Sequence, residues 1–196
     1  MNILVDTLPD TVEINGRQYG INTDFRVCLK TIMACEDPEL TGHEKSMVIL
    51  TNLYREIPED LEAAIERAQW FLDGGSSPSK QEESNGQRPR VYSFAKDASF
   101  IFAAFRQTHG IDLQTAQMHW WVFVALFMDI GGDTTFSQLM ALRDRVKSGK
   151  ATKDERETAS RLGAIFHLPE TDYRTLDELE AEDEFMKAWN SRKKTG

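Results

Sequence analysis

One strong β-hairpin signal, followed by helical patterning, limits the fold of this chain more than any other feature. Asn15-Gly16 favours a two-residue hairpin turn, because both central positions of that turn require positive φ, which Asn and Gly adopt at little cost. The flanking residues 11–14 and 17–21 alternate apolar and polar side chains. In the register of such a turn, one face of the hairpin carries Val12, Ile14, Tyr19 and Ile21. A lone hairpin is marginally stable in water, so we expect this face to pack on helices.

The sequence on either side of the hairpin gives two more expectations. The apolar run Ile3-Leu4-Val5 predicts an additional edge strand. A first helix is expected over residues 24–35, because apolar residues recur there at the spacing of three and four that marks one helix face. The expected buried stripe of that helix consists of Phe25, Leu29, Ile32 and Met33.

Capping patterns mark several later helices. Capping boxes at residues 41–44, 152–155 and 175–178 each predict a helix start, since the first residue and the acid three positions later satisfy each other's backbone N–H groups. The helix that starts at Thr152 is expected to reach Phe166. A further helix is expected to begin at Pro58 and to end before Gly74-Gly75.

The most apolar helices are predicted in the second half of the chain. Ser93 is expected to cap a helix that runs to His109, and Asp112 one that runs from Leu113 to Ile130. A threonine at 134 or 135 should cap the helix that follows, at residues 136–147. The predicted fold class is therefore mainly α: a helical bundle of about seven to eight helices with a small N-terminal β-hairpin.

Composition divides the chain into four segments. Residues 74–90 contain three Gly, two Pro and four Ser and no apolar side chain larger than proline, so burial there cannot offset the entropy of ordering. We therefore predict a hairpin and three helices over residues 1–73, a flexible loop or linker over 74–91, an apolar helical core region over 92–168 and an acidic helical extension over 169–196. Whether the helical parts form one domain or two stays open.

Charge and hydropathy exclude two classes of partner. The net charge is -9 and the pI is about 5.0, which opposes binding to a phosphate backbone. The best nucleic-acid candidate is a basic cluster without interleaved aromatic residues, formed by Arg143, Arg145, Lys147, Lys150 and Lys153. The longest apolar run, Trp120–Met128, is too short to span a bilayer, and the N-terminus has no basic segment of a signal peptide. We expect a soluble intracellular protein with no nucleic-acid or membrane partner.

No residue pattern indicates catalysis. The four histidines lack metal-ligand spacing, and nucleophile and phosphate-loop motifs are missing from the sequence. His109 is expected to interact with a helix end, and His119 to be a hydrogen-bonded structural residue. Cys28 and Cys35 lie two helical turns apart, about 10 Å along the axis, which predicts two free buried thiols rather than a disulfide. The sequence therefore predicts no enzyme, no cofactor and no metal site.

Protein recognition is the function that these exclusions leave. Aromatic residues and methionines concentrate between Phe94 and Met140. Adjacent tryptophans on a helix diverge by about 100°, so burying both in a small bundle is difficult. Because Trp and Met are enriched in protein-binding patches, the candidate contact residues are Trp120, Trp121, Met128 and Met118. The alternative is that both tryptophans belong to a two-sided core.

Several stretches resemble the "gene product fifteen" family of tailed bacteriophages. The resemblance covers residues 1–168 approximately and leaves out residues 169–196, and the loop at 76–89 is longer than is usual in the family. In the first half it rests on Ile21–Arg26, Ile57–Ala64 and Trp70–Gly75. In the second half it rests on Tyr92–Phe94 with Asp97, Ile101–Phe105, Gly110–Leu113, His119–Trp121 with Phe123, Ala125 and Leu126, and Asp133–Met140.

The resemblance implies a bacteriophage protein that acts in assembly of the long tail. Members of the family are regarded as tail-assembly chaperones, so the implied partners are the tape-measure protein and the tail-tube protein or a second tail chaperone, in the host cytoplasm. The implied alternative is a structural component that stays in the virion tail. The family has no catalytic residues to transfer to this sequence. The oligomeric state and the partner surface stay open.

Overall fold

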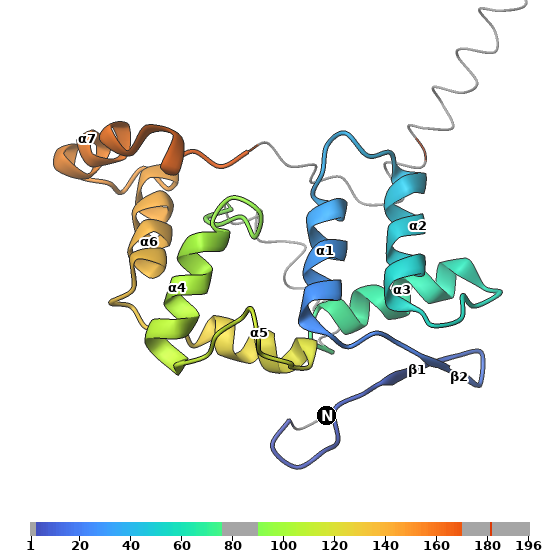
Figure 1. Cartoon of the computed structure of the whole chain (residues 1–196). Helices are drawn as coiled ribbons and strands as arrows, with labels where there is room; N and C mark the ends of the chain where they lie inside the picture. Colours follow the sequence, from blue (N-terminus) through green and yellow to red (C-terminus); the bar gives the residue numbers. More distant parts are fainter. Residues whose placement is uncertain (1–2, 76–89, 170–180, 182–196) are drawn as a thin grey trace, which may run out of the picture. The chain divides into compact units, whose positions relative to one another are not determined.

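The computed structural model describes residues 3–75, 90–169 and 181 (Figure 1). These residues belong to two compact units, one that includes residues 3–75 and one that includes residues 90–169, and each unit is described by itself. Within the described ranges the structure is mainly α, with seven α-helices and one two-stranded hairpin. The predicted fold class is therefore confirmed. Most of the helical extension predicted over 169–196 and most of the predicted loop at 74–91 lie outside the described residues.

The hairpin forms in the predicted register. Strands β1 (Thr11–Ile14) and β2 (Arg17–Gly20) are antiparallel, and Val12 pairs with Tyr19. Asn15 and Gly16 adopt φ of 50° and 79°, as the tight turn requires. The predicted apolar face is buried: its members Val12, Ile14, Tyr19 and Ile21 are all less than 9% exposed.

The predicted edge strand at Ile3-Leu4-Val5 is wrong. These three residues form a turn, and their side chains are 47%, 88% and 78% exposed. Three residues can contribute few ladder hydrogen bonds to offset the entropy of ordering them. An apolar run alone is therefore not enough to define a strand.

Three helices complete the first unit: α1 (Phe25–Cys35), α2 (Gly42–Leu53) and α3 (Leu61–Leu72). The side chain of Asp24 caps α1, the predicted Thr41–Glu44 capping box opens α2, and Asp60 caps α3. Asn15 also donates to the carboxylate of Asp60 at 2.9 Å, which ties the hairpin turn to the start of α3. The third helix is predicted to begin at Pro58. It begins three residues later, at Leu61, directly after its capping residue Asp60.

The buried face of α1 differs from the predicted stripe. Phe25 is buried as predicted, together with Cys28 and Thr31. The other members of the predicted stripe, Leu29, Ile32 and Met33, are only half-buried. A polar bond explains the position of Thr31, because the side chain of Asn52 on α2 donates to its hydroxyl at 3.2 Å. The apolar pattern of α1 therefore located the helix but not the side that faces α2.

The second unit contains α4 (Ala98–His109), α5 (Trp120–Met128), α6 (Thr135–Lys147), α7 (Lys153–Leu162) and a short 3-10 helix (Gly163–Ile165). In this unit α4 packs against α5 and α6, and α6 packs against α7 (Figure 1). Apolar side chains between α6 and α7 form one core cluster: Leu139, Leu142, Ala159 and Phe166, with Phe100, Val146 and Leu162 packed against it. Aromatic rings form a second group around α5, described below.

Two predicted helix starts in this unit are wrong. Asp112 caps a separate turn through Gln114 and Ala116, and the helix expected from Leu113 starts only at Trp120. Ser93 caps a turn that precedes α4, through Lys96. In each case a polar residue caps the nearest turn instead of the helix further along.

The helix that begins after Thr152 ends earlier than predicted. It stops at Leu162 because Gly163 adopts φ of 52°, which is outside the helical region, and the 3-10 turn follows instead of further helix up to Phe166. No helix in the described ranges has the length and apolar character needed to cross a membrane.

Candidate functional site

Helix α5 carries most of the residues predicted for protein binding. Its nine residues are WWVFVALFM, without a charged side chain, and four of them are buried: Trp120, Trp121, Phe123 and Phe127. The Phe123 ring stacks on those of Phe105 and Trp120, with centroids 5.0 and 5.5 Å apart. Phe127 continues the cluster toward Phe136 on α6. The inward side of α5 is therefore held by ring packing.

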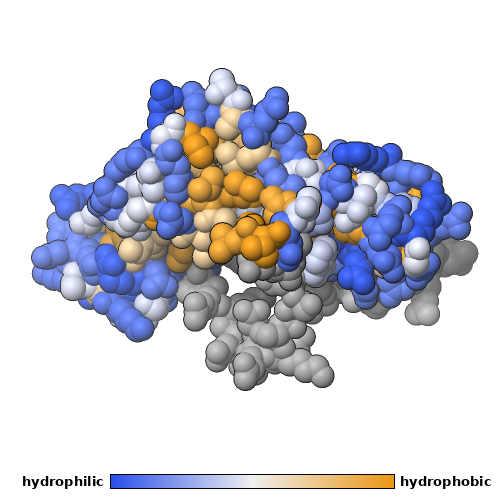
Figure 2. Space-filling view, turned by 90° about the horizontal axis from the view of Figure 1, so that it is seen from below, coloured by the Kyte–Doolittle hydropathy of each residue, from blue (hydrophilic) through white to orange (hydrophobic). Residues whose placement is uncertain are grey.

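The four candidate contact residues differ in exposure. Trp120 and Trp121 are 2% and 6% exposed, so both tryptophans lie in the core. Met118 precedes α5 and is half-buried. Met128 is 78% exposed. Together with the half-buried Val124 and the exposed Ala125, Met128 forms what we call the α5 outer face. Figure 2 shows the molecule from below, with hydrophobic residues at the surface among hydrophilic ones.

Two histidines bind the ends of α5. The Nδ1 atom of His119 accepts from the Trp121 backbone N–H at 3.1 Å, which makes His119 the N-cap. At the other end, Nε2 of His109 donates to the Leu126 carbonyl oxygen at 2.9 Å. The predicted structural role of His119 is confirmed. His109 binds a helix end as expected, but it is the end of α5 and not that of its own helix.

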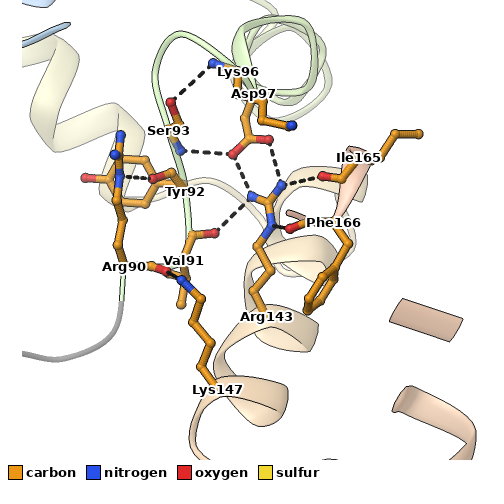
Figure 3. A network of polar contacts seen from close by, with 10 residues as sticks. All are labelled: Arg90, Val91, Tyr92, Ser93, Lys96, Asp97, Arg143, Lys147, Ile165 and Phe166. Carbon is orange, nitrogen blue, oxygen red and sulfur yellow. Dashed lines mark hydrogen bonds and ion pairs between the residues drawn. The ribbon is translucent and has the colours of Figure 1, made fainter. Parts of the chain in front are cut away.

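A buried ion pair joins α4 to α6 (Figure 3). Arg143 of α6 and Asp97, the residue before α4, are 0% and 1% exposed in their side chains. The guanidinium donates through Nη1 to one carboxylate oxygen at 2.6 Å and through Nη2 to the other at 3.0 Å. The backbone N–H of Ser93 also donates to this carboxylate at 3.0 Å. The pair thus has the bidentate geometry in which Arg binds a carboxylate most strongly.

The other donors of Arg143 bind backbone carbonyls. Nε donates to the Phe166 oxygen at 2.8 Å, Nη2 to the Ile165 oxygen at 2.6 Å and Nη1 to the Val91 oxygen at 3.0 Å. All five N–H groups of the side chain therefore have acceptors. This complete set of bonds is what makes a buried charge tolerable, and it assigns Arg143 a structural role.

The basic cluster that includes Arg143 is divided by the fold. Arg145 forms an ion pair with Glu155 at 2.7 Å, and Lys147 donates to the Arg90 carbonyl at 2.6 Å. Lys150 and Lys153 are exposed. Arg143 is thus buried away from the other basic residues of the cluster, and Arg145 and Lys147 each bind a group of this chain.

Comparison with known proteins now identifies the family. A family model described as "Bacteriophage Gp15 protein" matches residues 4–168, well over half of the chain. The chain belongs to this family. Membership supports a bacteriophage structural or assembly protein and confirms the resemblance seen in the sequence. No curated protein and no solved structure matched the chain.

The Gp15 family match ends close to the buried ion pair. It stops at residue 168, two residues after Phe166, whose carbonyl binds Arg143. Residues 169–196 lie beyond the match, as the sequence resemblance predicted. The matched region therefore contains every partner of the Arg143 guanidinium.

One motif of the Gp15 resemblance forms the corner between α5 and α6. Thr134 is 1% exposed, donates to the Gly131 carbonyl at 2.9 Å and accepts from the Ser137 N–H at 3.1 Å. The Gly131 N–H donates to the hydroxyl of Thr108 on α4 at 3.2 Å. The start of this Asp133–Met140 motif is therefore explained by the structure of a turn.

The described ranges contain no cluster of three or more metal-ligating side chains. Both thiols are free, as predicted, but only Cys28 is buried and Cys35 is half-buried. Burial raises the pKa of Cys28 to about 12 and that of Cys35 to about 11. Thiols with such pKa values stay protonated near neutral pH and are poor nucleophiles. The cysteines accordingly show none of the activation that a catalytic thiol requires.

The buried pairing of Arg143 with Asp97 is what sequence reasoning missed. In the sequence, Arg143 belongs to a basic cluster, because positive residues recur between positions 143 and 153. A signal was present, since Leu139, Leu142 and Val146 place position 143 next to the apolar stripe of α6. The identity of its partner was not accessible, because Asp97 lies 46 residues away in sequence.

Proposed function

We propose that this protein is a tail-assembly chaperone, and that it binds an apolar helical segment of the tape-measure protein through the α5 outer face (Val124, Ala125 and Met128). Family membership supports a phage structural or assembly role. The observation that carries the proposal further is Met128, which is 78% exposed on a helix without charged side chains. Methionine is flexible and polarizable, which suits it to binding surfaces that accept varied apolar partners.

The mode of binding would be a helix laid against a helix. A tape-measure segment with an apolar stripe would cover Met128 and Ala125 and would itself be shielded from water until the tail tube forms around it. The exposed Asp129 and Asp133 lie close in sequence to this face. These two carboxylates favour a partner segment with basic residues beside its apolar stripe.

The proposal includes the cellular setting. The protein would act in the host cytoplasm during assembly, by binding alone and without catalysis. The tail-tube protein or a second tail chaperone would join the same complex.

Substitution of Met128 tests the proposal. Met128→Glu places a charge on the α5 outer face without disturbing a buried residue, so stability should change by no more than about 0.5 kcal/mol. Co-expression with the tape-measure protein of the same phage should raise the soluble yield of that protein, and Met128→Glu should abolish the increase. The matched control is Met47→Glu, since Met47 is 40% exposed on α2 of the first unit.

The outcomes separate the alternatives. The proposal is supported if the wild-type chain and Met47→Glu both raise the soluble yield of the tape-measure protein and Met128→Glu does not. If the wild-type chain neither raises the yield nor co-purifies with the tape-measure protein, the chaperone function is wrong. Mass spectrometry of purified virions gives the second check, because a chaperone should be absent or far below the abundance of tail subunits.

A further inference from the structure

The Arg143 guanidinium binds segments near both ends of residues 90–169, the described part of the second unit. Val91 is the second residue of this range, and Ile165 and Phe166 lie near its last residue, Pro169. Carbonyl oxygens from both ends accept hydrogen bonds from the same side chain (Figure 3). Residues that enter and leave the unit are thus joined through one group, although more than 70 positions separate them in sequence.

Further contacts hold the segment that enters the second unit. Lys147, one turn after Arg143 on α6, donates to the Arg90 carbonyl at 2.6 Å. Arg90 in turn donates through Nε to the Tyr92 carbonyl at 2.6 Å. The Tyr92 ring packs on Phe94, Phe127 and Phe136, with centroids 5.1 to 6.3 Å away. The entering segment of chain is therefore held by charge, by backbone bonds and by ring packing.

The second unit also has a hydrophobic core of its own. The cluster between α6 and α7 and the aromatic group around α5 are built from residues of this unit. An independent core and chain ends that lie close together are the two properties expected of a domain that folds alone and tolerates insertion into another chain.

We propose that residues 90–169 are an autonomous folding unit, and that Arg143 is the clamp that closes it by binding Asp97 and both chain ends. Opening this unit requires the chain ends to separate, which removes three carbonyl acceptors from a guanidinium that is otherwise buried. Lysine cannot replace it, because an ammonium group has three donors and no planar fork. The clamp is independent of which partner the α5 outer face binds.

Native-state hydrogen exchange of the full chain, followed by mass spectrometry, tests the autonomy. With increasing urea, amides of α4 to α7 should converge on one opening reaction, and amides of α1 to α3 on a different one. A protease recognition sequence substituted for residues 80–86 provides the second measurement. After cleavage in the otherwise intact chain, protection in α4 to α7 should stay within about twofold of its former value. Loss of that protection, or one common opening reaction for all seven helices, overturns the proposal.

Variants of α6 test the clamp. Arg143→Lys should lower protection in α4 to α7 by at least about tenfold and leave α1 to α3 unchanged. The matched control Arg145→Lys, in the partly exposed ion pair with Glu155, should change protection in neither set of helices. If Arg143→Lys unfolds the second unit outright, α1 to α3 should still be protected. In that case Lys147→Met is the milder variant, because it removes only the hydrogen bond from Lys147 to the Arg90 carbonyl. Equal loss in both units, or no loss in either, contradicts the proposal.

Discussion

A buried guanidinium is stable only where its N–H donors all find acceptors, because an unpaired buried charge costs several kcal/mol. Arg143 meets this condition with one carboxylate and three backbone carbonyls. The three carbonyls belong to residues outside the α-helices. Because no α-helical hydrogen bond is available to these oxygens, the Arg143 side chain supplies the donors that they need. At the residue scale, Arg143 therefore both pairs a charge and binds backbone carbonyls of the segment before α4 and of the end of the 3-10 helix.

Removing one partner of this pair should be far more costly than removing both. Arg143→Met leaves the Asp97 carboxylate buried without its cation and should lower the free energy of unfolding by about 4 kcal/mol. The double variant Arg143→Met with Asp97→Leu should recover part of that loss. Urea denaturation followed by circular dichroism measures each value. Arg145→Met is the control, since a partly exposed pair contributes less than about 1 kcal/mol. Equal effects at positions 143 and 145 would contradict this account.

The thiols make stability depend on alkaline pH. Burial raises the pKa of Cys28 to about 12 and of Cys35 to about 11, compared with 9.0 for an unperturbed thiol. Between these values the unfolded chain loses thiol protons that the folded chain keeps, so the free energy of unfolding falls as pH rises from about 9 to about 11. Urea titrations across this range should give a steeper fall for wild type than for Cys28→Ala. Identical slopes would show that Cys28 does not titrate differently in the two states.

At the element scale, local capping chemistry decides where helices begin. Both predicted capping boxes in the described ranges form, and the backbone hydrogen bond from each capping threonine is the first cause of a lowered pKa at Glu44 and at Glu155. Helix α5 shows the opposite case. Its apolar pattern begins well before Trp120, but Asp112 and His119 cap two different turns, so the helix has nine residues. Caps therefore limit this helix more strongly than its hydropathy does.

The hairpin turn offers a direct test of backbone conformation. Gly16 has φ of 79° and open space where a Cβ atom would lie, so Gly16→Ala should cost about 1 kcal/mol through backbone strain alone. Gly132→Ala is the control, because Gly132 also has open space and its φ is not positive. Thermal unfolding should show a lower midpoint for the first variant only. A similar midpoint for both would mean that the turn changes its type to accommodate alanine.

At the scale of the whole molecule, charge is distributed unevenly. Residues 3–75 contain 14 acidic and 6 basic residues, a net charge of -8, whereas residues 90–169 contain 8 acidic and 10 basic residues, a net charge of +2. The first of these two ranges therefore has a net charge of -8, compared with -9 for the whole chain. Like charges at this density destabilise a compact state by mutual repulsion, and dissolved salt screens that repulsion.

Salt should therefore stabilise the two units differently. Raising the ionic strength from about 0.01 M to about 0.15 M shortens the Debye length from about 30 Å to about 8 Å. Hydrogen-exchange protection in α1 to α3 should rise, and protection in α4 to α7 should change less. Measuring both sets in one sample provides an internal control. A uniform change across all helices would show that net charge does not govern the difference.

The sequence by itself determined the features that depend on neighbouring residues. The hairpin register follows from Asn15-Gly16, the starts of α2 and α7 follow from their capping boxes, and the mainly α class and the family follow from patterns along the chain. Only the tertiary structure decided which faces are buried and which charges pair. Arg143 meets Asp97 across 46 positions, and Thr31 rather than Leu29 faces α2, because these contacts depend on how helices pack and not on local spacing.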